Sequence, residues 1–350
     1  MIMRKASGKA EYRRIAAELE MAIRRSEYQD KLDNIQILAE RFDVAKQTMT
    51  NALQLLRSCN ILEHHGRAGM QILRKNLPTG VIAIIGRWTD EHFQENYDSM
   101  QPVIAEIEKC GFNIVLMRIL SSSMEFLSQL ELSNFAGLIF TRHALTETVA
   151  EKLSARKTPF VSISRLPLYP DMDYVNFDTD TAVKVLARDL KNAGYRKIAL
   201  LFPSSSEGYN QLLRKMWKKI KRELDLEILS CDRLCHKDEL KWEENAANYF
   251  KHIDRMPEKP EVLIHYGSYT PERIKVYKSI MPDYPANMRI VHVASGEDQQ
   301  LEPRNVVFKN ASAAVLLHEA FNLLLEKMRS PEAPPVHRLI PYNIEYLQNI

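Results

Sequence analysis

"RFDVAKQTMTNALQLLRSCNIL", residues 41–62, joins a tight turn to a segment with the apolar period of a helix. Its apolar side chains recur at spacings of three and four, which predicts an inward-facing stripe: Met49, Ala52, Leu53 and Leu56. Its polar beginning consists of Lys46, Gln47, Thr48, Thr50 and Asn51. Thr and Asn are indifferent helix formers, so we expect these residues to serve a contact outside the chain. A merely solvated helix face is the alternative.

Two more helices and a hairpin are expected around this segment. Residues Tyr12–Arg25 carry one apolar stripe, and Asn34 is placed to cap a helix that continues to Phe42. The short β-type runs "ILEHH" and "MQIL" flank the glycines of "GRAG", Gly66–Gly69, which predicts a hairpin. Three helices followed by a hairpin predict a winged helix-turn-helix.

The charge of the chain is unevenly distributed. Residues 1–75 contain 14 Lys and Arg against 9 Asp and Glu, whereas the remaining residues contain 34 against 36, within a net charge of +3. A cationic first fifth favours a polyanionic partner for that part. We therefore expect a DNA-binding domain at 1–75, a linker at 76–80 with its Pro and Gly, and a separate domain at 81–350.

The larger part alternates short apolar strands with amphipathic helices, beginning with "GVIAIIG" at residues 80–86. This alternation is typical of a parallel sheet covered on both faces. The pattern starts again near "TAVKVLARDL", so two α/β lobes in series around a ligand cleft are expected. In such sheets, ligands bind beyond the carboxyl ends of the strands.

The first segments resemble the DNA-binding domain of GntR-type transcription regulators over about Tyr12 to Leu73. The matching positions are Leu32, Leu38, Ala39, Val44, Thr48, Ala52, Leu53 and Gly69. The resemblance implies DNA contacts from Gln36, Lys46, Gln47, Thr48, Thr50, Asn51 and the wing residue Arg67. Gln36 and Thr50 stand where the family has arginines, and Lys46 is not equivalent to Arg for bidentate contacts to guanine. A different operator is therefore expected.

The remainder resembles the effector domain of LacI-type regulators, which has a periplasmic-binding-protein-like fold. Asp178 stands in that family's "Asp-Asn" motif, and Arg214 stands at the arginine that commonly holds the ligand. With residues that follow strand ends, the implied ligand-binding set is Arg87, Trp88, His92, Phe93, Thr141, Arg165, Asp178, Arg214, Ser268 and Ser295. An inter-lobe salt bridge or a helix cap is the alternative for Asp178 and Arg214. Ser268 and Ser295 lie where the family has acidic acceptors, which leaves an altered ligand, or none, open.

Enzyme, cofactor and membrane classes are not favoured. The chain has no nucleophile elbow, P-loop or dinucleotide-binding fingerprint, and its apolar runs are far shorter than a bilayer span. A zinc site at "CDRLCH", Cys231–His236, lacks a second ligand pair. The four scattered cysteines and the absence of an apolar leader suggest the cytoplasm.

The sequence thus predicts a cytoplasmic homodimeric repressor without a cofactor, whose partners are a double-stranded DNA operator and a small-molecule effector, a carbohydrate. Two alternatives stay open. One is a DNA-binding dimer whose effector domain has lost its ligand, and the other is an α/β enzyme with an accessory domain.

Overall fold

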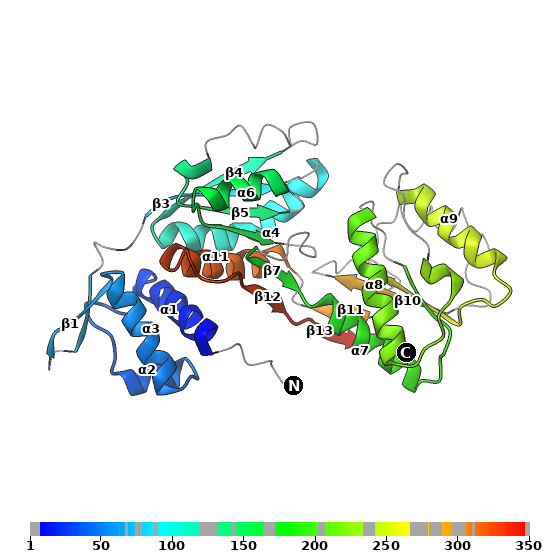
Figure 1. Ribbon diagram of the computed structural model, residues 1–350, viewed down its shortest axis with the longest axis horizontal. Helices are drawn as coiled ribbons and strands as arrows, with labels where there is room; N and C mark the ends of the chain where they lie inside the picture. Colours follow the sequence, from blue (N-terminus) through cyan, green and yellow to red (C-terminus); the bar gives the residue numbers. More distant parts are fainter. Residues whose placement is uncertain are drawn as a thin grey trace. The chain divides into compact units, whose positions relative to one another are not determined.

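The computed structural model divides the chain into two compact units (Figure 1). It describes residues 8–66, 69–73, 77, 79–86, 90–119, 132–141, 144–163, 172–201, 207–233, 242–266, 279, 289–295, 306–309 and 312–346. Unit 1 comprises Met1–Asn176 with Ala313–Arg338, and unit 2 comprises Phe177–Ser312 with Leu339–Ile350. The two α/β halves were expected in series, and in the structure a late segment, Ala313–Arg338, returns to unit 1.

Unit 1 begins with a head of three helices and a two-stranded antiparallel sheet. Its elements are α1 (Gly8–Arg24), α2 (Ile35–Arg41), α3 (Lys46–Ser58), β1 (Leu62–His64) and β2 (Met70–Ile72). Each was predicted, and the inward stripe of α3 is confirmed because Met49, Ala52, Leu53 and Leu56 are buried in the core of the head.

Local chemistry fixes where α2 and α3 begin. The side-chain oxygen of Asn34 accepts hydrogen bonds from the backbone N–H groups of Gln36 and Ile37, both at 3.0 Å, and so caps α2. Between the two helices, Asp43 has φ = 51°, a left-handed conformation that Asp tolerates better than most residues. This single residue turns the chain tightly enough for α2 and α3 to pack together.

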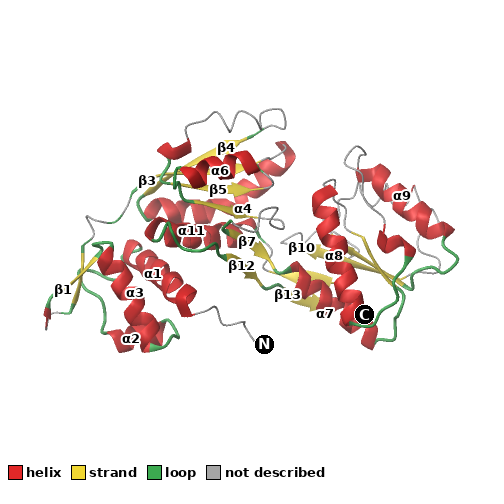
Figure 2. Cartoon of the chain, viewed as in Figure 1, coloured by secondary structure: helices red, strands yellow, loops and turns green. Residues whose placement is uncertain are grey.

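The rest of unit 1, here called the first lobe, is built on a six-stranded sheet of order β12-β7-β6-β5-β3-β4 (Figure 2). The strands are β3 (Gly80–Gly86), β4 (Phe112–Arg118), β5 (Gly137–Thr141), β6 (Phe160–Ile163), β7 (Tyr174–Phe177) and β12 (His337–Ile340). The pairs from β4 through β3, β5 and β6 to β7 are all parallel. Its helices are α4 (Asp90–Lys109), α6 (Glu147–Ala155) and α11 (Ala313–Arg329), with a short 3-10 helix at Leu132–Asn134.

Helices cover both faces of this sheet, as the strand pattern predicted. On one face, Val149 and Leu153 of α6 share a core with Ala83 and Ile85 of β3. On the other face, α11 packs against β5 and β6. The rings of Phe321 and Phe112 meet edge-on, with their centroids 5.6 Å apart. The first lobe is therefore a three-layer α/β structure.

Unit 2, the second lobe, contains a five-stranded sheet of order β13-β11-β10-β9-β8. Its strands are β8 (Ile198–Leu201), β9 (Val262–Tyr266), β10 (Arg289–Ser295), β11 (Val306–Lys309) and β13 (Asn343–Tyr346). The pairs from β8 to β11 are parallel and β13 is antiparallel to β11. Its helices are α7 (Thr179–Asn192), α8 (Glu207–Glu223) and α9 (Trp242–Arg255), with a 3-10 helix at Ser230–Arg233.

Several elements differ from the sequence prediction. Helices expected at residues 124–132 and 271–280 fall almost entirely outside the described residues. The strands β7, β11, β12 and β13 and the helices α9 and α11 were not predicted. The helix α11 escaped notice because it is apolar on nearly every side, which hides a helical period, and its burial explains that composition.

Candidate nucleic-acid interface

The first turn of α3 is an exposed polar surface that the sequence predicted for the head. Lys46 and Gln47 are exposed, while Thr48, Thr50 and Asn51 are half-buried at the same end of the helix. The opposite face is fixed by the buried apolar stripe, so the rotation of α3 about its axis is settled. This rotation leaves the amino-terminal side chains available to an external partner.

Two hydrogen bonds organise these side chains. The amide nitrogen of Gln47 donates to the Oδ1 atom of Asn51 at 3.0 Å, and the Thr50 hydroxyl donates to the Lys46 carbonyl at 2.8 Å. Gln47 keeps its amide oxygen as an acceptor, and Asn51 keeps its amide nitrogen as a donor. The pair therefore presents an acceptor and a donor side by side, which is the complement that an adenine edge requires.

Lys46 creates an electropositive helix beginning. A cation in the first turn opposes the helix macrodipole, at a cost of about 0.3–1 kcal/mol. The first turn of α3 contains no acidic residue, and Ala45 offers no side-chain cap. Among the described residues no carboxylate forms an ion pair with Lys46. Uncapped N–H groups together with this ammonium group suit a phosphate or a guanine edge.

The other predicted DNA-contacting residues are only partly placed. Gln36 is exposed on α2, where its amide donates to Glu40 at 3.3 Å. Arg67, which lies between β1 and β2 in the sequence, is outside the described residues. Glu63 on β1 and the ring of His65, the residue that follows β1, lie 3.1 Å apart.

Much of the basic charge of the head is directed elsewhere. Arg41 contacts Glu27 at 2.5 Å and the Tyr28 hydroxyl at 3.0 Å. Arg24 and Arg25 face the first lobe rather than α3's exposed turn. The charge count of residues 1–75 therefore overstated the positive potential available to a polyanion.

A buried ionic contact anchors the head to the first lobe. Glu20 on α1 is fully buried and its two carboxylate oxygens accept hydrogen bonds from Arg329 on α11 at 2.8 and 2.9 Å. Arg24 donates to the same carboxylate at 2.7 and 2.9 Å, donates to the Cys110 carbonyl, and lies over the Phe112 ring. Sequence reasoning missed this contact, since Glu20 and Arg24 have the spacing of an ordinary surface pair.

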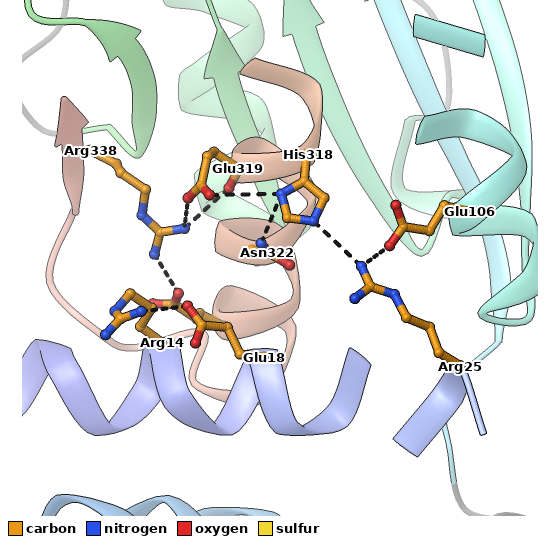
Figure 3. Close-up of polar contacts among 9 residues, drawn as sticks. Arg14, Glu18, Arg25, Glu106, His318, Glu319, Asn322 and Arg338 are labelled. Carbon is orange, nitrogen blue, oxygen red and sulfur yellow. Dashed lines mark hydrogen bonds and ion pairs between the residues drawn. The ribbon is translucent and has the colours of Figure 1, made fainter. Parts of the chain in front are cut away.

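A second set of polar contacts involves side chains from α1, α4, α11 and β12 (Figure 3). His318 on α11 lies 3.5 Å from Arg25, the residue that follows α1, and Arg25 also pairs with Glu106 of α4. Arg338 of β12 bonds Glu319 at 3.2 Å and Glu326 at 2.5 Å. The head is thus joined to α4 and α11 by side chains from several elements.

Burial and charge act in opposite directions on the acidic groups of this second set of contacts. Burial raises the pKa of Glu326, although the neighbouring Arg338 opposes the shift. For Glu319 burial also favours the neutral form, but the hydrogen bond from His318 and the charge of Arg338 leave its pKa below the usual range. Loss of Arg338 would therefore leave a buried carboxyl without its counter-ion.

Three of the predicted ligand-binding residues have described side chains: Thr141, Asp178 and Arg214. Thr141 ends β5, is buried, and its hydroxyl has no hydrogen-bond partner among the described residues. Asp178 caps α7 by accepting from the Thr181 backbone N–H at 3.1 Å, which confirms the capping alternative. Arg214 is half-buried on α8. Thr141 belongs to unit 1, whereas Asp178 and Arg214 belong to unit 2.

The structure does not describe the side chains of the other predicted ligand-binding residues. Arg87, Trp88, Arg165 and Ser268 are outside the described residues. His92 and Phe93 belong to α4, and Ser295 ends β10, but their side chains are not described. No contact with a ligand is assigned to any of them.

The described part of the chain shows neither a metal-binding cluster nor a membrane-spanning helix. Cys231 is buried, and burial together with Asp232 raises the pKa of its thiol to about 11. The described residues contain no group of three His, Cys, Asp or Glu side chains arranged for a metal ion, and Cys235 and His236 lie outside them. None of the described helices combines the length and the apolar character that crossing a bilayer requires.

Comparison with known proteins identifies the fold. Neither a protein-family model nor a curated protein matches the chain. Among solved structures, the transcription regulator CcpA of Lactococcus lactis aligns with a TM-score of 0.57 and 17% identity over 77% of this chain and 98% of its own. The transcriptional regulator CelR in complex with cellobiose aligns with a TM-score of 0.58 and 12% identity over 90% and 98%. CcpA from Weissella paramesenteroides with bound glucose aligns with a TM-score of 0.56 and 14% identity over 77% of this chain and 96% of its own. The chain therefore has the fold of LacI-family transcription regulators.

Proposed function

We propose that the protein is a ligand-responsive transcription regulator that binds double-stranded operator DNA in the cytoplasm and acts as a repressor. The observation that carries the proposal is the exposed first turn of α3, with Lys46, Gln47 and Asn51 on a helix whose opposite face is buried. Recognition helices use this end to reach base edges, and these residue types match guanine and adenine. The fold shared with LacI-family regulators supports the sensing half of the proposal.

The head is proposed to act as a GntR-type winged helix-turn-helix. In this assignment α2 and α3 form the helix-turn-helix and the β1–β2 hairpin forms the wing. Arg67, between β1 and β2 in the sequence, is the proposed minor-groove contact. Thr50 stands where the family has an arginine, and its hydroxyl donates to the Lys46 carbonyl. Thr50 therefore cannot make a bidentate contact to guanine. The operator should accordingly differ from that of typical GntR regulators.

The proposed active form is a homodimer. Two-fold symmetry would place one α3 at each half-site of a near-palindromic operator, with half-sites about 34–36 Å apart or a multiple of that distance. The mutual anchoring of α1 and α11 supports a mechanism in which the head follows the first lobe, because the fully buried Glu20 is bonded to Arg329, whose side chain is only 11% exposed. A ligand that changes the lobes would then change the spacing of the heads.

The proposed effector is a small carbohydrate or a derivative. Solved structures of the same fold contain cellobiose or glucose, and the buried Thr141 hydroxyl at the carboxyl end of β5 is suited to a ligand hydroxyl. Asp178 and Arg214 are the proposed polar contacts from the second lobe. The effector must bind one conformation better than the other, or it would shift nothing.

A mobility-shift assay on the DNA upstream of the protein's own gene tests the proposal. Binding should weaken steeply with salt, with a slope of log affinity against log salt of about −0.9 per phosphate contacted. A panel of cellobiose, glucose, ribose and sugar acids should contain a compound that raises the melting temperature and weakens operator binding. Binding of DNA with silence across the panel would instead favour a regulator that has lost its ligand. Failure to bind any duplex would overturn the proposal.

A further inference from the structure

A basic pocket of about 500 Å³ lies along α8 in the second lobe, a helix labelled in Figure 1. Five cationic side chains of that helix line it: Arg214, Lys215, Lys218, Lys221 and Arg222. The only other lining residues in the described part of the chain are Ile228 and Asp232. We call this feature the α8 pocket.

Two lining residues of the α8 pocket, Lys221 and Asp232, form a buried, hydrogen-bonded ion pair that we call its floor. Asp232 accepts hydrogen bonds from Lys221 at 2.6 Å, from the Trp217 indole at 2.8 Å and from the Leu229 backbone at 2.7 Å. Lys221 is fully buried and also donates to the Glu227 carbonyl at 2.7 Å. Burial lowers the pKa of Lys221, an effect that the charge of Asp232 opposes. Asp232 is thus committed to Lys221 and cannot neutralise the remaining cations.

Those remaining cations repel one another. Lys215, Lys218 and Arg222 are exposed and follow each other at spacings of three and four, so they share one helix face. In the part of the chain that the structure describes, none of these three forms an ion pair. Their neighbour Lys219 differs, since it lies 3.9 Å from Glu223 and does not line the pocket.

The chemistry of the pocket selects an anion. Arg and Lys bind phosphate and carboxylate groups through charge-assisted hydrogen bonds, with Arg able to use both prongs of its guanidinium. An anion would relieve the repulsion along α8 while the Lys221–Asp232 floor stays in place. Ile228, 50% exposed at the rim, adds an apolar surface for the carbon skeleton of a ligand.

We propose that the α8 pocket binds a small polyanionic metabolite that carries phosphate or clustered carboxylate groups. The site lies within the second lobe and needs no contribution from the head, so it does not depend on the proposed binding of DNA. Arg214 lines the pocket as well, but the test below relies on residues that have no other assigned role.

The test is calorimetric titration of the full-length protein with inorganic pyrophosphate and with citrate, at constant ionic strength set by NaCl. We expect saturable binding of one or both probes, and the preferred probe tells phosphate from carboxylate recognition. The double variant Lys218→Gln/Arg222→Gln should weaken binding by about tenfold or more, because two charge-assisted contacts are lost. Its melting curve should match wild type, since both side chains are exposed.

Lys219→Gln is the matched control, because it removes the same charge from the same helix outside the pocket. We expect its affinity to stay within about twofold of wild type. Equal weakening in Lys219→Gln and in the double variant Lys218→Gln/Arg222→Gln would show general attraction to a basic helix and would overturn the site. Absence of saturable binding by both probes would overturn it as well.

Discussion

Glu20 and Arg329 are 309 residues apart in sequence and form a buried ion pair with two hydrogen bonds, at 2.8 and 2.9 Å. Glu20 is also bonded to Arg24, so one carboxylate bridges two guanidinium groups, one on α1 and one on α11. All three side chains are almost fully shielded from water. Removing the carboxylate would leave two buried like charges facing each other.

We therefore expect Glu20→Gln to lower the free energy of unfolding of unit 1 by about 3–5 kcal/mol. Urea unfolding, combined with hydrogen exchange in α1 and α11, measures this loss and shows where protection disappears. Glu18→Gln is the control on the same helix, because Glu18 pairs with Arg14 at a half-exposed position and should contribute about 0.5 kcal/mol or less. Similar losses in both variants would contradict a structural role for the buried pair.

The sequence predicted the parts of this molecule that depend on local patterns. Met49, Ala52, Leu53 and Leu56 have a helical period because one face of α3 is buried, and Asn34 caps α2 through its own neighbours. The contact between Glu20 and Arg329 has no local pattern, because its partners come from opposite ends of the chain. Asp178 was ambiguous for a related reason, since a cap and a ligand contact require the same residue type at the same place.

The second prediction concerns the exposed turn of α3. Lys46→Ala should weaken operator binding by about 1–3 kcal/mol if the ammonium group reads guanine, and should reduce the salt slope by about 0.9 if it also contacts a phosphate. Helix formation should be slightly favoured, because Ala removes a cation from a helix beginning. Fluorescence anisotropy with labelled operator at several salt concentrations measures both effects.

Arg57→Ala provides the matched comparison, because Arg57 is exposed in the last turn of the same helix. Recognition helices use their amino-terminal residues for base edges, so this variant should retain the discrimination between operator and unrelated duplex. If Arg57→Ala lost discrimination and Lys46→Ala did not, the assigned polarity of α3 on DNA would be wrong.

A third prediction is a pH dependence at the beginning of β8. Glu261 accepts hydrogen bonds from the backbone N–H groups of Arg196 at 2.7 Å and Lys197 at 3.0 Å, and these bonds hold its pKa below the usual range. A carboxyl whose pKa is lowered by folding stabilises the protein above its unfolded-state pKa, and this contribution is lost as the pH falls through the folded-state pKa. Glu261→Gln should therefore cost stability at pH 7 and little at strongly acidic pH.

The expected cost at pH 7 is about 1 kcal/mol, because the carboxylate is exposed and its hydrogen bonds compete with water. Glu258→Gln removes a carboxylate that pairs with the Lys197 side chain at 3.0 Å and is 68% exposed, so it should have almost no effect at either pH. Urea midpoints across the pH range separate the two variants. A Glu261→Gln loss that is independent of pH would rule out the ionised carboxylate as its source.

The final prediction concerns a close approach of α11 to the sheet at Gly137. A Cβ atom placed on Gly137 of β5 would lie 2.7 Å from a side-chain carbon of Leu324, so the two elements pack too closely for any larger residue. Gly137→Ala should destabilise the first lobe by about 1–3 kcal/mol through overpacking.

Leu324→Ala alone should cost about 2–5 kcal/mol, because it empties a fully buried position. The added methyl group then occupies part of the space that Leu324 vacates. The double variant should consequently lose less than the sum of the two single losses, by at least about 0.5 kcal/mol. Strict additivity in urea unfolding would mean that α11 does not rest on β5 at this point.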